Sequence, residues 1–250
     1  MKVTLITVCY NSARTLQETI DSVLSQTYAE IEYIIIDGGS TDATPTIIEP
    51  YKSRIAHYVS EPDEGLYDAM NKGIALSSGD MVGILNSDDM LAHSNVIADI
   101  VKAMDSNTDA VCSDVFIFKN TKDNIVRRYR CTRWKPWMFR LGHQPPHPGF
   151  FVRRNCYEKY GLFDVQFKRA ADFELLFRFI RVHAIRTRYL SYTSVLMRSG
   201  GSSQQGLKAI SEANREDHRA LRKHGYFSAL PLIWCKYVLK VFQWIFLKPS

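Results

Sequence analysis

The sequence contains little cysteine and no cysteine pair at the spacing of a metal or redox site. Its five Cys are an odd number without a Cys-x-x-Cys motif, which argues against a disulfide framework and favours a reducing compartment. We also expect no secretory signal, because Met1-Lys2 leads directly into a strand pattern rather than a long apolar run. There is no internal repeat, low-complexity tract or evident linker, so we expect one compact unit.

Basic residues are scarce in the first half of the chain. Residues 1–118 hold 6 Lys and Arg against 18 Asp and Glu, a balance of −12, whereas residues 119–250 hold 26 against 8, a balance of +18. Charge runs usually form ordinary solvated surface, but a split this large more often marks a partner. The acidic half suits a metal ion, and the basic half suits phosphates or an anionic membrane surface.

Strand and helix patterns alternate through the first half. Apolar runs predict strands at 3–9, 31–36, 55–59 and 81–85. Helices are predicted at 12–26 with Ser12 as the cap, from Thr41 or Asp42 with Pro45 in the first turn, at 66–77, and after Ser94. This rhythm predicts an α/β fold with a mainly parallel sheet, in which ligands bind beyond the carboxyl ends of the strands.

The second half is less regular. Strand patterns cover 110–118 and 125–129, and a loop with the sequence HQPPHPG follows at 143–149. Asp172 opens an apolar-faced helix, and a polar helix spans about 206–224 and stops at Gly225. His143 and His147 have no matching third ligand, so we interpret them as loop or acceptor-contact residues rather than metal ligands.

Polar clusters follow three of the predicted strands. They are Asn11-Ser12, the stretch DGGSTD at 37–42, and Asn86-Ser87-Asp88-Asp89. Each alone is explained by a turn. In a parallel sheet, however, these loops share one edge, and together they outline a pocket of donors and acceptors that suits a nucleotide base and ribose.

The adjacent carboxylates Asp88 and Asp89 repel each other, so their position needs a reason. An acidic turn that caps the next helix is one. A divalent cation that bridges a diphosphate is the other, because Mg²⁺ typically takes one or two carboxylates together with phosphate oxygens. Such a cation offsets the repulsion and neutralises a leaving diphosphate.

Five motifs in order give the chain a resemblance to the family 2 glycosyltransferases. They are TVCYNS (7–12), DGGSTD (37–42), DEGLYDAMNKG (63–73), SSGD (77–80) and NSDD (86–89), and the resemblance covers roughly residues 3–200. It is closest to bacterial exopolysaccharide, O-antigen and colanic-acid-type transferases. The resemblance implies a GT-A fold, which is a Rossmann-like nucleotide-binding fold, and transfer of a sugar from a nucleotide-sugar with inversion.

The resemblance also implies roles for individual residues. Thr7, Tyr10 and Asn11 would line the base and ribose pocket, and Asp37 would bind the base. Asp68 and Lys72 would lie near the diphosphate or the sugar. The family's Asp-x-Asp motif matches Asn86-Ser87-Asp88, so Asp88 would bind Mg²⁺ or Mn²⁺ with Asp89 beside it. Asn86 replaces the first Asp, and its amide oxygen can still hydrogen-bond the ribose.

The family's catalytic base sits in an acidic pair that opens a helix. Here the match is Ala171-Asp172-Phe173-Glu174-Leu175 followed by Arg178, and only Asp172 stands at the base position. Its carboxylate would take the proton from the acceptor hydroxyl as that oxygen attacks the anomeric carbon. Asp172 also suits a helix cap, and Glu174 is the weaker candidate for the base.

The resulting prediction is one glycosyltransferase domain at 1–225. Residues 1–105 form its nucleotide-sugar-binding half and residues 106–225 its acceptor-binding half. The acceptor is expected to be a lipid-linked oligosaccharide at the cytoplasmic face of the cell membrane. Gly200-Gly201-Ser202-Ser203 is either a loop that closes over the substrates or a plain turn.

Three alternatives stay open or are rejected on particular residues. A processive synthase carries a QxxRW motif after the base, whereas RCTRW at 130–134 has Arg in place of Gln and precedes Asp172, so we reject it. A basic nucleic-acid-binding protein is disfavoured because the Lys and Arg are scattered and no recognition module is legible. A catalytically weak or inactive nucleotide-sugar-binding homologue is supported by Asn86.

The segment 226–250 is expected to be an amphipathic C-terminal helix. Its apolar stretch at 226–247 approaches the length of a membrane span of about 20 residues. Lys236 and Lys240 lie in its middle, four residues apart and so on one helical face. We therefore predict a helix in the plane of the membrane whose Lys face reaches anionic headgroups. The alternative is a helix packed on the protein's own core or on a second subunit of a homodimer.

Overall fold

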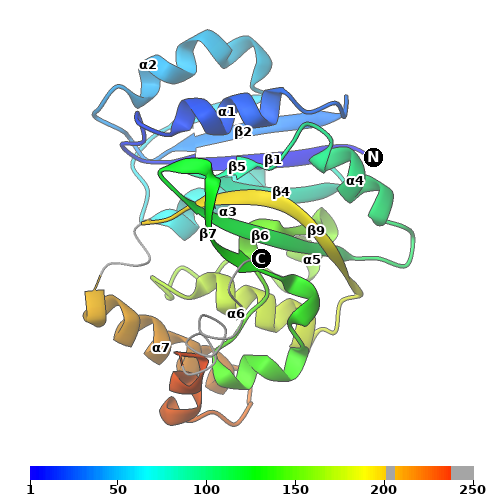
Figure 1. Cartoon of the computed structure of the whole chain (residues 1–250), viewed down its shortest axis with the longest axis vertical. Coiled ribbons are helices and arrows are strands. Elements are labelled where there is room, and N and C mark those ends of the chain that lie inside the picture. Colours follow the sequence, from blue (N-terminus) through cyan, green and yellow to red (C-terminus); the bar gives the residue numbers. More distant parts are fainter. Residues whose placement is uncertain (201–205, 238–250) are drawn as a thin grey trace.

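A computed structural model of the chain describes residues 1–200 and 206–237. A single mixed sheet runs through the molecule, with strands in the order β3-β2-β1-β4-β8-β6-β9-β5 and β7 paired to β6 (Figure 1). The strands are β1 (Val3–Cys9), β2 (Ile31–Asp37), β3 (His57–Ser60), β4 (Met81–Asn86), β5 (Met90–Leu91), β6 (Ala110–Lys119), β7 (Thr121–Tyr129), β8 (Phe150–Arg153) and β9 (Thr187–Arg198).

The helices connect these strands. The α-helices are α1 (Leu16–Leu24), α2 (Thr44–Ile48), α3 (Leu66–Leu76), α4 (Val96–Ala103), α5 (Arg154–Tyr160), α6 (Ala171–Phe177) and α7 (Gly206–Lys223). Short turns of 3₁₀-helix form η1 (Glu49–Arg54), η2 (Cys131–Arg133), η3 (Pro136–Leu141) and η4 (His147–Gly149), and η5 (Arg178–Val182) is a π-helical turn that extends α6. A further helical segment covers residues 230–237.

The first four strands of the sheet are parallel. β1 pairs in parallel with both β2 and β4, and β2 pairs in parallel with β3. β8 then joins the two halves of the chain, because it pairs antiparallel with β4 on one side and with β6 on the other. The predicted α/β fold with a mainly parallel sheet is confirmed, and the sheet continues across the expected boundary between residues 105 and 106.

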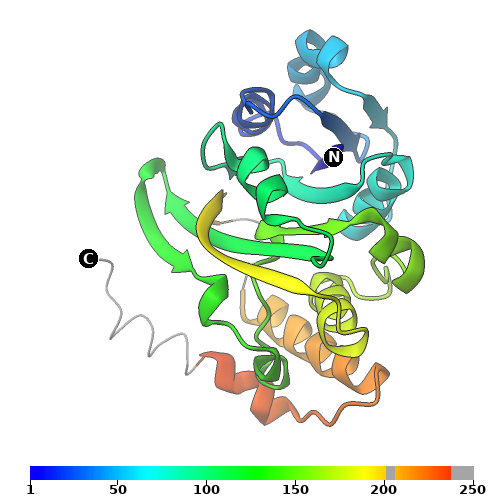
Figure 2. The same ribbon diagram turned by 90° about the vertical axis from the view of Figure 1, so that its right-hand side faces the viewer.

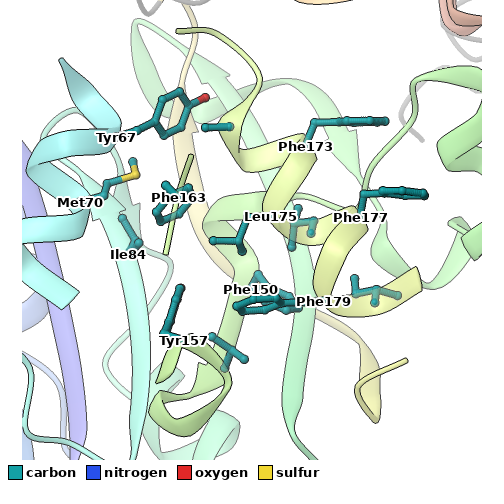
Figure 3. Packing of buried hydrophobic residues seen from close by; sticks show 14 of the residues in the cluster. Tyr67, Met70, Ile84, Phe150, Tyr157, Phe163, Phe173, Leu175, Phe177 and Phe179 are labelled. Carbon is teal, nitrogen blue, oxygen red and sulfur yellow. The ribbon is translucent and has the colours of Figure 1, made fainter. Parts of the chain in front are cut away.

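Two hydrophobic clusters cover the two faces of this sheet. Alternate residues of β1 belong to different clusters, since Leu5 packs with α1 and α4 on one face and Ile6 packs with α3 on the other. Gly73 of α3 permits that second contact, because a β-carbon at this position would lie 2.4 Å from Cγ2 of Ile6. Figure 3 shows how Tyr67 and Met70 of α3 meet aromatic residues of α5, β8 and α6 in this cluster.

The second half of the chain forms the lower part of the molecule in Figure 1. α6 packs against α7, and Figure 2 shows both below the long strands β6 and β9. Within the described residues no helix is long and apolar enough to cross a membrane.

Several helices begin at other residues than the sequence patterns predict. α1 begins at Leu16 instead of residue 12, and residues 13–15 form a preceding turn in which the carbonyl oxygen of Ser12 accepts from the backbone N–H groups of Thr15 and Leu16. α4 begins after Asn95 rather than Ser94, and α6 begins at Ala171 with Ala170 at the cap position. Asp172 therefore lies within the first turn of α6 and is not its cap.

Candidate active site

The loops after β1, β2 and β4 meet at one edge of the sheet. The register places Cys9 beside Asp37 and Val8 beside Asn86, so the residues that follow converge. The backbone N–H of Asn11 donates to Oγ of Ser40 at 2.8 Å, and Oδ1 of Asn11 accepts from the backbone of Thr41 at 2.9 Å. Asn11 adopts a left-handed conformation with φ of 48°, which Asn tolerates better than most residues. The three predicted polar clusters thus form one connected rim.

The acidic pair lies at the end of β4. Asp89 is 1% exposed, and its Oδ1 accepts from the backbone of Arg198 at 3.2 Å. Its Oδ2 accepts from Nδ2 of Asn86 at 3.4 Å, which turns Oδ1 of Asn86 away from the carboxylate. That Oδ1 is buried and has no hydrogen-bond partner among the described residues. Ser87 joins this turn to the first loop through its hydroxyl, 2.8 Å from that of Ser12.

The ionised forms of Asp88 and Asp89 are disfavoured in the absence of a positively charged partner. Burial raises the pKa of Asp88, and burial together with the charge of Asp88 raises the pKa of Asp89 well above its usual range. Arg198 offsets this only in part, through its backbone N–H and its charge. A cation at Asp88 would stabilise both ionised carboxylates.

The donor set fits a hard divalent cation that also binds a ligand. Among residues 1–200 and 206–237 no three His, Cys, Asp or Glu side chains gather to hold a metal unaided. The protein would contribute Asp88, with Asp89 beside it and the unpartnered amide oxygen of Asn86. The remaining ligands would be phosphate oxygens and water, which is how Mg²⁺ is commonly held.

Thr7 and Asp37 lie deeper than the sequence suggests. Thr7 is fully buried, and its hydroxyl accepts from Tyr33 at 3.0 Å. Asp37 is also fully buried, with Oδ1 accepting from the hydroxyl of Ser40 at 2.5 Å and Oδ2 from that of Ser60 at 2.7 Å. Their contact with a nucleotide stays a prediction, and in this arrangement both shape the loops from within.

Tyr10 is an exposed aromatic ring beside these loops, since 62% of its surface is accessible. Next to it lies Gly38, where a β-carbon would be 2.3 Å from Oδ2 of Asp63 and 3.5 Å from Cδ2 of Tyr10. Asp63 was not among the predicted site residues. The only signal for it was its place at the start of the motif DEGLYDAMNKG.

Asp68 and Lys72 lie together on the first turns of α3. Nζ of Lys72 is 3.5 Å from Oδ2 of Asp68 and 2.9 Å from Oε1 of Glu61. Oδ2 of Asp68 also accepts from the backbone of Glu64 at 3.1 Å. Both side chains are partly exposed beside the loop after β3. Their predicted role at the diphosphate or sugar is untested by these contacts.

Asp172 is held by two side chains from distant parts of the chain. The hydroxyl of Tyr67 donates to Oδ1 at 3.0 Å, and Nε2 of Gln144 donates to Oδ2 at 2.6 Å. Burial raises the pKa of Tyr67 well above its usual range, so its hydroxyl stays protonated and donates. Asp172 itself is half-buried and partly open to solvent. Tyr67 and Gln144 were not predicted, although both lie within sequence motifs, DEGLYDAMNKG and HQPPHPG.

Glu174 has a different environment from Asp172. It is fully buried. Its carboxylate accepts hydrogen bonds from Nε and Nη2 of Arg178, Nζ of Lys223 and Nε2 of His224. Burial alone would raise its pKa, but hydrogen bonds from His224 and Arg178 and the charges of Arg178 and Lys223 outweigh burial and lower it to about 2. A carboxylate this enclosed cannot reach an acceptor, so the structure argues against Glu174 as the base.

His143 lies in the loop after η3 and His147 is the first residue of η4, and both are buried. The ring of His147 packs edge-on against Phe163, and burial lowers its pKa. The carbonyl oxygen of His143 accepts from Nε1 of Trp134 at 2.9 Å. These contacts agree with a role in packing the loop. The loop expected at Gly200–Ser203 falls mostly outside the described residues.

The prediction that Lys236 faces anionic headgroups is wrong. Its Nζ lies 2.6 Å from Oδ2 of Asp217 on α7, and both side chains are buried. Burial raises the pKa of Asp217 to about 6 in spite of this partner. Ile233 is fully buried on the same side. Lys240 lies outside the described residues.

Comparison with known proteins decides the family. The sequence model of "Glycosyl transferase family 2" matches residues 4–161, which contain the whole rim described above. The chain belongs to glycosyl transferase family 2. An uncharacterized glycosyltransferase of Mycobacterium tuberculosis is 36% identical over 181 residues, covering 70% of this chain and 68% of the relative. A PGL/p-HBAD biosynthesis glycosyltransferase of Mycobacterium bovis is 28% identical over 185 residues, covering 72% and 70%.

Solved structures show the same fold. TarS 1-349 of S. aureus, in complex with UDP-GlcNAc, superposes with a TM-score of 0.68 at 17% identity over 88% of this chain and 66% of TarS. The mannosyltransferase PcManGT of Pyrobaculum calidifontis, in complex with GDP-Man and Mn²⁺, gives 0.62 at 17% identity over 97% and 80%. In a further structure of TarS 1-349, the match covers 65% of the length of TarS. The predicted GT-A fold is confirmed.

Proposed function

We propose that this family 2 member is an inverting, metal-dependent glycosyltransferase. It moves a sugar from a nucleotide-diphosphate sugar to a hydroxyl of a lipid-linked oligosaccharide in bacterial surface polysaccharide synthesis. The observation that carries the proposal is the pair of the partly buried Asp88 and the buried Asp89 beside the unpartnered Oδ1 of Asn86, at the edge where three loops meet. Mg²⁺ or Mn²⁺ bound there would neutralise the leaving diphosphate.

The chain's own residues divide the remaining work. Tyr10 and Asn11, with Thr7 and Asp37 beneath them, shape the nucleoside pocket, and Asp68 and Lys72 face the diphosphate or sugar from α3. Asp172 takes the proton of the acceptor hydroxyl, because it is the half-exposed carboxylate of α6 while Glu174 is enclosed by cations. Inversion follows when that hydroxyl attacks opposite the diphosphate, with Asp172 behind the attacking oxygen.

We expect the acceptor at the inner face of the cell membrane, and the support comes from a different surface than the predicted Lys face. Lys236 faces the protein, so the exposed apolar side chains of the same region are the ones available to lipid. They are Phe227, Leu230, Leu232 and Trp234. A cavity of about 310 Å³ lies nearby, with aromatic walls from Trp137 and Tyr226 and the basic side chains Arg140 and Arg181 in its lining. Exposed Trp with Arg and Lys is typical of peripheral attachment at an anionic interface.

One observation favours a second candidate, a weak or inactive nucleotide-sugar-binding homologue. Asn86 supplies a neutral oxygen where the family has a carboxylate, which reduces the negative charge available to a cation. The two candidates differ in turnover rather than in binding. Detectable hydrolysis of a nucleotide-sugar would exclude the inactive homologue.

A thermal-shift screen of UDP-, GDP- and dTDP-sugars with Mg²⁺, Mn²⁺ or EDTA tests the proposal. A donor at 100 times its dissociation constant stabilises the fold by about 2.7 kcal/mol. We expect one donor to raise the melting temperature, and only with a divalent cation. Stabilisation by generic RNA without any effect of a nucleotide-sugar would instead favour a nucleic-acid-binding protein.

A further inference from the structure

The carboxylate of Asp37 is not available to hydrogen-bond the base of a bound nucleotide. A base is commonly read by hydrogen bonds to its edge and by stacking on an aromatic face. Tyr10 offers the face, but both oxygens of Asp37 already accept from serine hydroxyls, and no part of the side chain reaches the surface. The group that reads the base edge must therefore come from elsewhere.

Asp63 is a second carboxylate beside the loop after β2, and it lies close to Gly38. Its Oδ1 accepts from the backbone of Gly65 at 2.8 Å, which fixes the carboxylate in the turn before α3. Its Oδ2 accepts no hydrogen bond from the described residues and lies close to Gly38, because a β-carbon there would be 2.3 Å from this oxygen and 3.5 Å from Cδ2 of Tyr10. The side chain is partly exposed. One free carboxylate oxygen thus lies next to one exposed aromatic ring.

Gly38 is what brings this carboxylate into the pocket. A β-carbon at position 38 would lie 2.3 Å from Oδ2 of Asp63 and 3.1 Å from its Cγ. Any other residue would therefore displace the carboxylate. The backbone does not itself require glycine here, because Gly38 lies outside the left-handed region, unlike Gly39 with φ of 78°. The absence of a side chain, and not backbone conformation, is the feature that position 38 supplies.

We propose that Asp63 is the specificity-determining residue for the base of the donor nucleotide, and that it selects a base with a ring N–H. A carboxylate accepts and does not donate, so it pairs with N3–H of uracil or thymine, or with N1–H and the amino group of guanine. Cytosine and adenine have no such ring N–H, so the carboxylate could accept only from their exocyclic amino group, next to the lone pair of a ring nitrogen. This inference rests on the proposed nucleotide-sugar function and names the residue that sets its base.

Binding of UDP, GDP, CDP and ADP to the full chain, measured by calorimetry with Mn²⁺, tests the assignment. Wild type should bind UDP or GDP about 10-fold or more tightly than CDP and ADP, as expected for one charge-assisted hydrogen bond. Asp63→Asn should bring the four affinities to within a few-fold of each other. Gly38→Ala should do the same although Asp63 is intact.

The controls separate this assignment from the function on which it rests. Glu64→Gln changes an exposed neighbouring carboxylate and should keep the wild-type preference. If UDP or GDP is preferred and Asp63→Asn leaves that preference unchanged, the assignment is overturned while nucleotide binding stands. Equal binding of all four nucleotides by wild type also overturns it. If none of the four binds even to wild type, the proposed function fails and the assignment falls with it.

Discussion

Nη2 of Arg178 lies 3.0 Å from Oε2 of Glu174, one helical turn away, and both side chains are almost excluded from water. The same guanidinium donates to the carbonyl oxygens of Tyr160, Gly161 and Leu162. Glu174 therefore joins α6 to the end of α5 through Arg178, and to the end of α7 through Lys223 and His224. Its position in the acidic motif serves the fold.

Glu174→Gln should destabilise the protein by about 3–5 kcal/mol, because it leaves Arg178 without its buried counter-ion. Urea unfolding at pH 7 measures this. The matched control is Glu158→Gln, which breaks an exposed pair with Arg154 and should cost at most about 1 kcal/mol. Equal losses in both variants would contradict the structural role of Glu174.

The contribution of Glu174 also has a defined pH dependence. Its pKa in the fold, about 2, is below the ordinary value of 4.5, so the ionised form is favoured by folding. This stabilisation is complete above about pH 4.5 and is lost as the pH falls toward 2. The stability difference between wild type and Glu174→Gln should therefore narrow when unfolding is measured at pH 3 rather than pH 6. A constant difference would contradict the assigned cause.

Asp172→Asn should lower turnover by about 10²–10⁴-fold while donor affinity is retained, as expected for loss of a general base. Nucleotide release from the donor gives the rate, and calorimetry gives the affinity. A loss of affinity equal to the loss of rate would point to a folding role, and near-normal turnover would remove Asp172 from the mechanism.

Tyr67→Phe should reduce turnover without changing donor affinity, because it removes one of the two donors that orient Asp172. We expect about a 10-fold effect, the equivalent of one hydrogen bond. Tyr160→Phe is the matched control, since its ring stacks on His183 away from Asp172. In the double variant Tyr67→Phe/Asp172→Asn, the loss should not exceed that of Asp172→Asn alone. Additive losses would mean that Tyr67 acts independently of Asp172.

Phe227→Ser combined with Trp234→Ser should weaken binding to vesicles that contain anionic lipid, because these are exposed apolar side chains, 69% and 45% accessible. Vesicle sedimentation measures this, with Leu162→Ser as the control at a similarly exposed site elsewhere. Removing residues 226–250 is a poorer test than the sequence suggests, since Ile233 and Lys236 pack into the protein. Binding unchanged by the double substitution would contradict membrane attachment through this surface.

The alternating half of the fold was predictable because β1, β2 and β4 are short apolar runs buried on both faces. Periodicity placed β1, β2 and β4 within a residue or so of their observed ends, and the loops after them converge as expected. Helix starts were less predictable. Ser12 has the right side chain for a cap, but its hydroxyl lies 2.8 Å from that of Ser87 on another loop. The carbonyl oxygen of Ser94 accepts from the backbone of Thr27, and the helix begins one residue later, after Asn95.

The parts of the site that escaped prediction depend on contacts across long stretches of chain. Tyr67 and Asp172 are 105 residues apart, and no local pattern relates them. Asp37 and Asp63 differ in burial, which the sequence does not reveal. Lys236 looked like a solvated residue because its partner, Asp217, lies on another helix.

The most direct test of the account is calorimetric titration of wild type and Asp88→Ala with the donor found in the thermal-shift screen, each with Mn²⁺ and with EDTA. Wild type should bind the donor with Mn²⁺ and lose most of that affinity in EDTA, because the diphosphate is held through a cation at Asp88. Asp88→Ala should bind equally weakly in both conditions. Full affinity of wild type in EDTA, or of Asp88→Ala with Mn²⁺, would contradict a metal-bridged donor site.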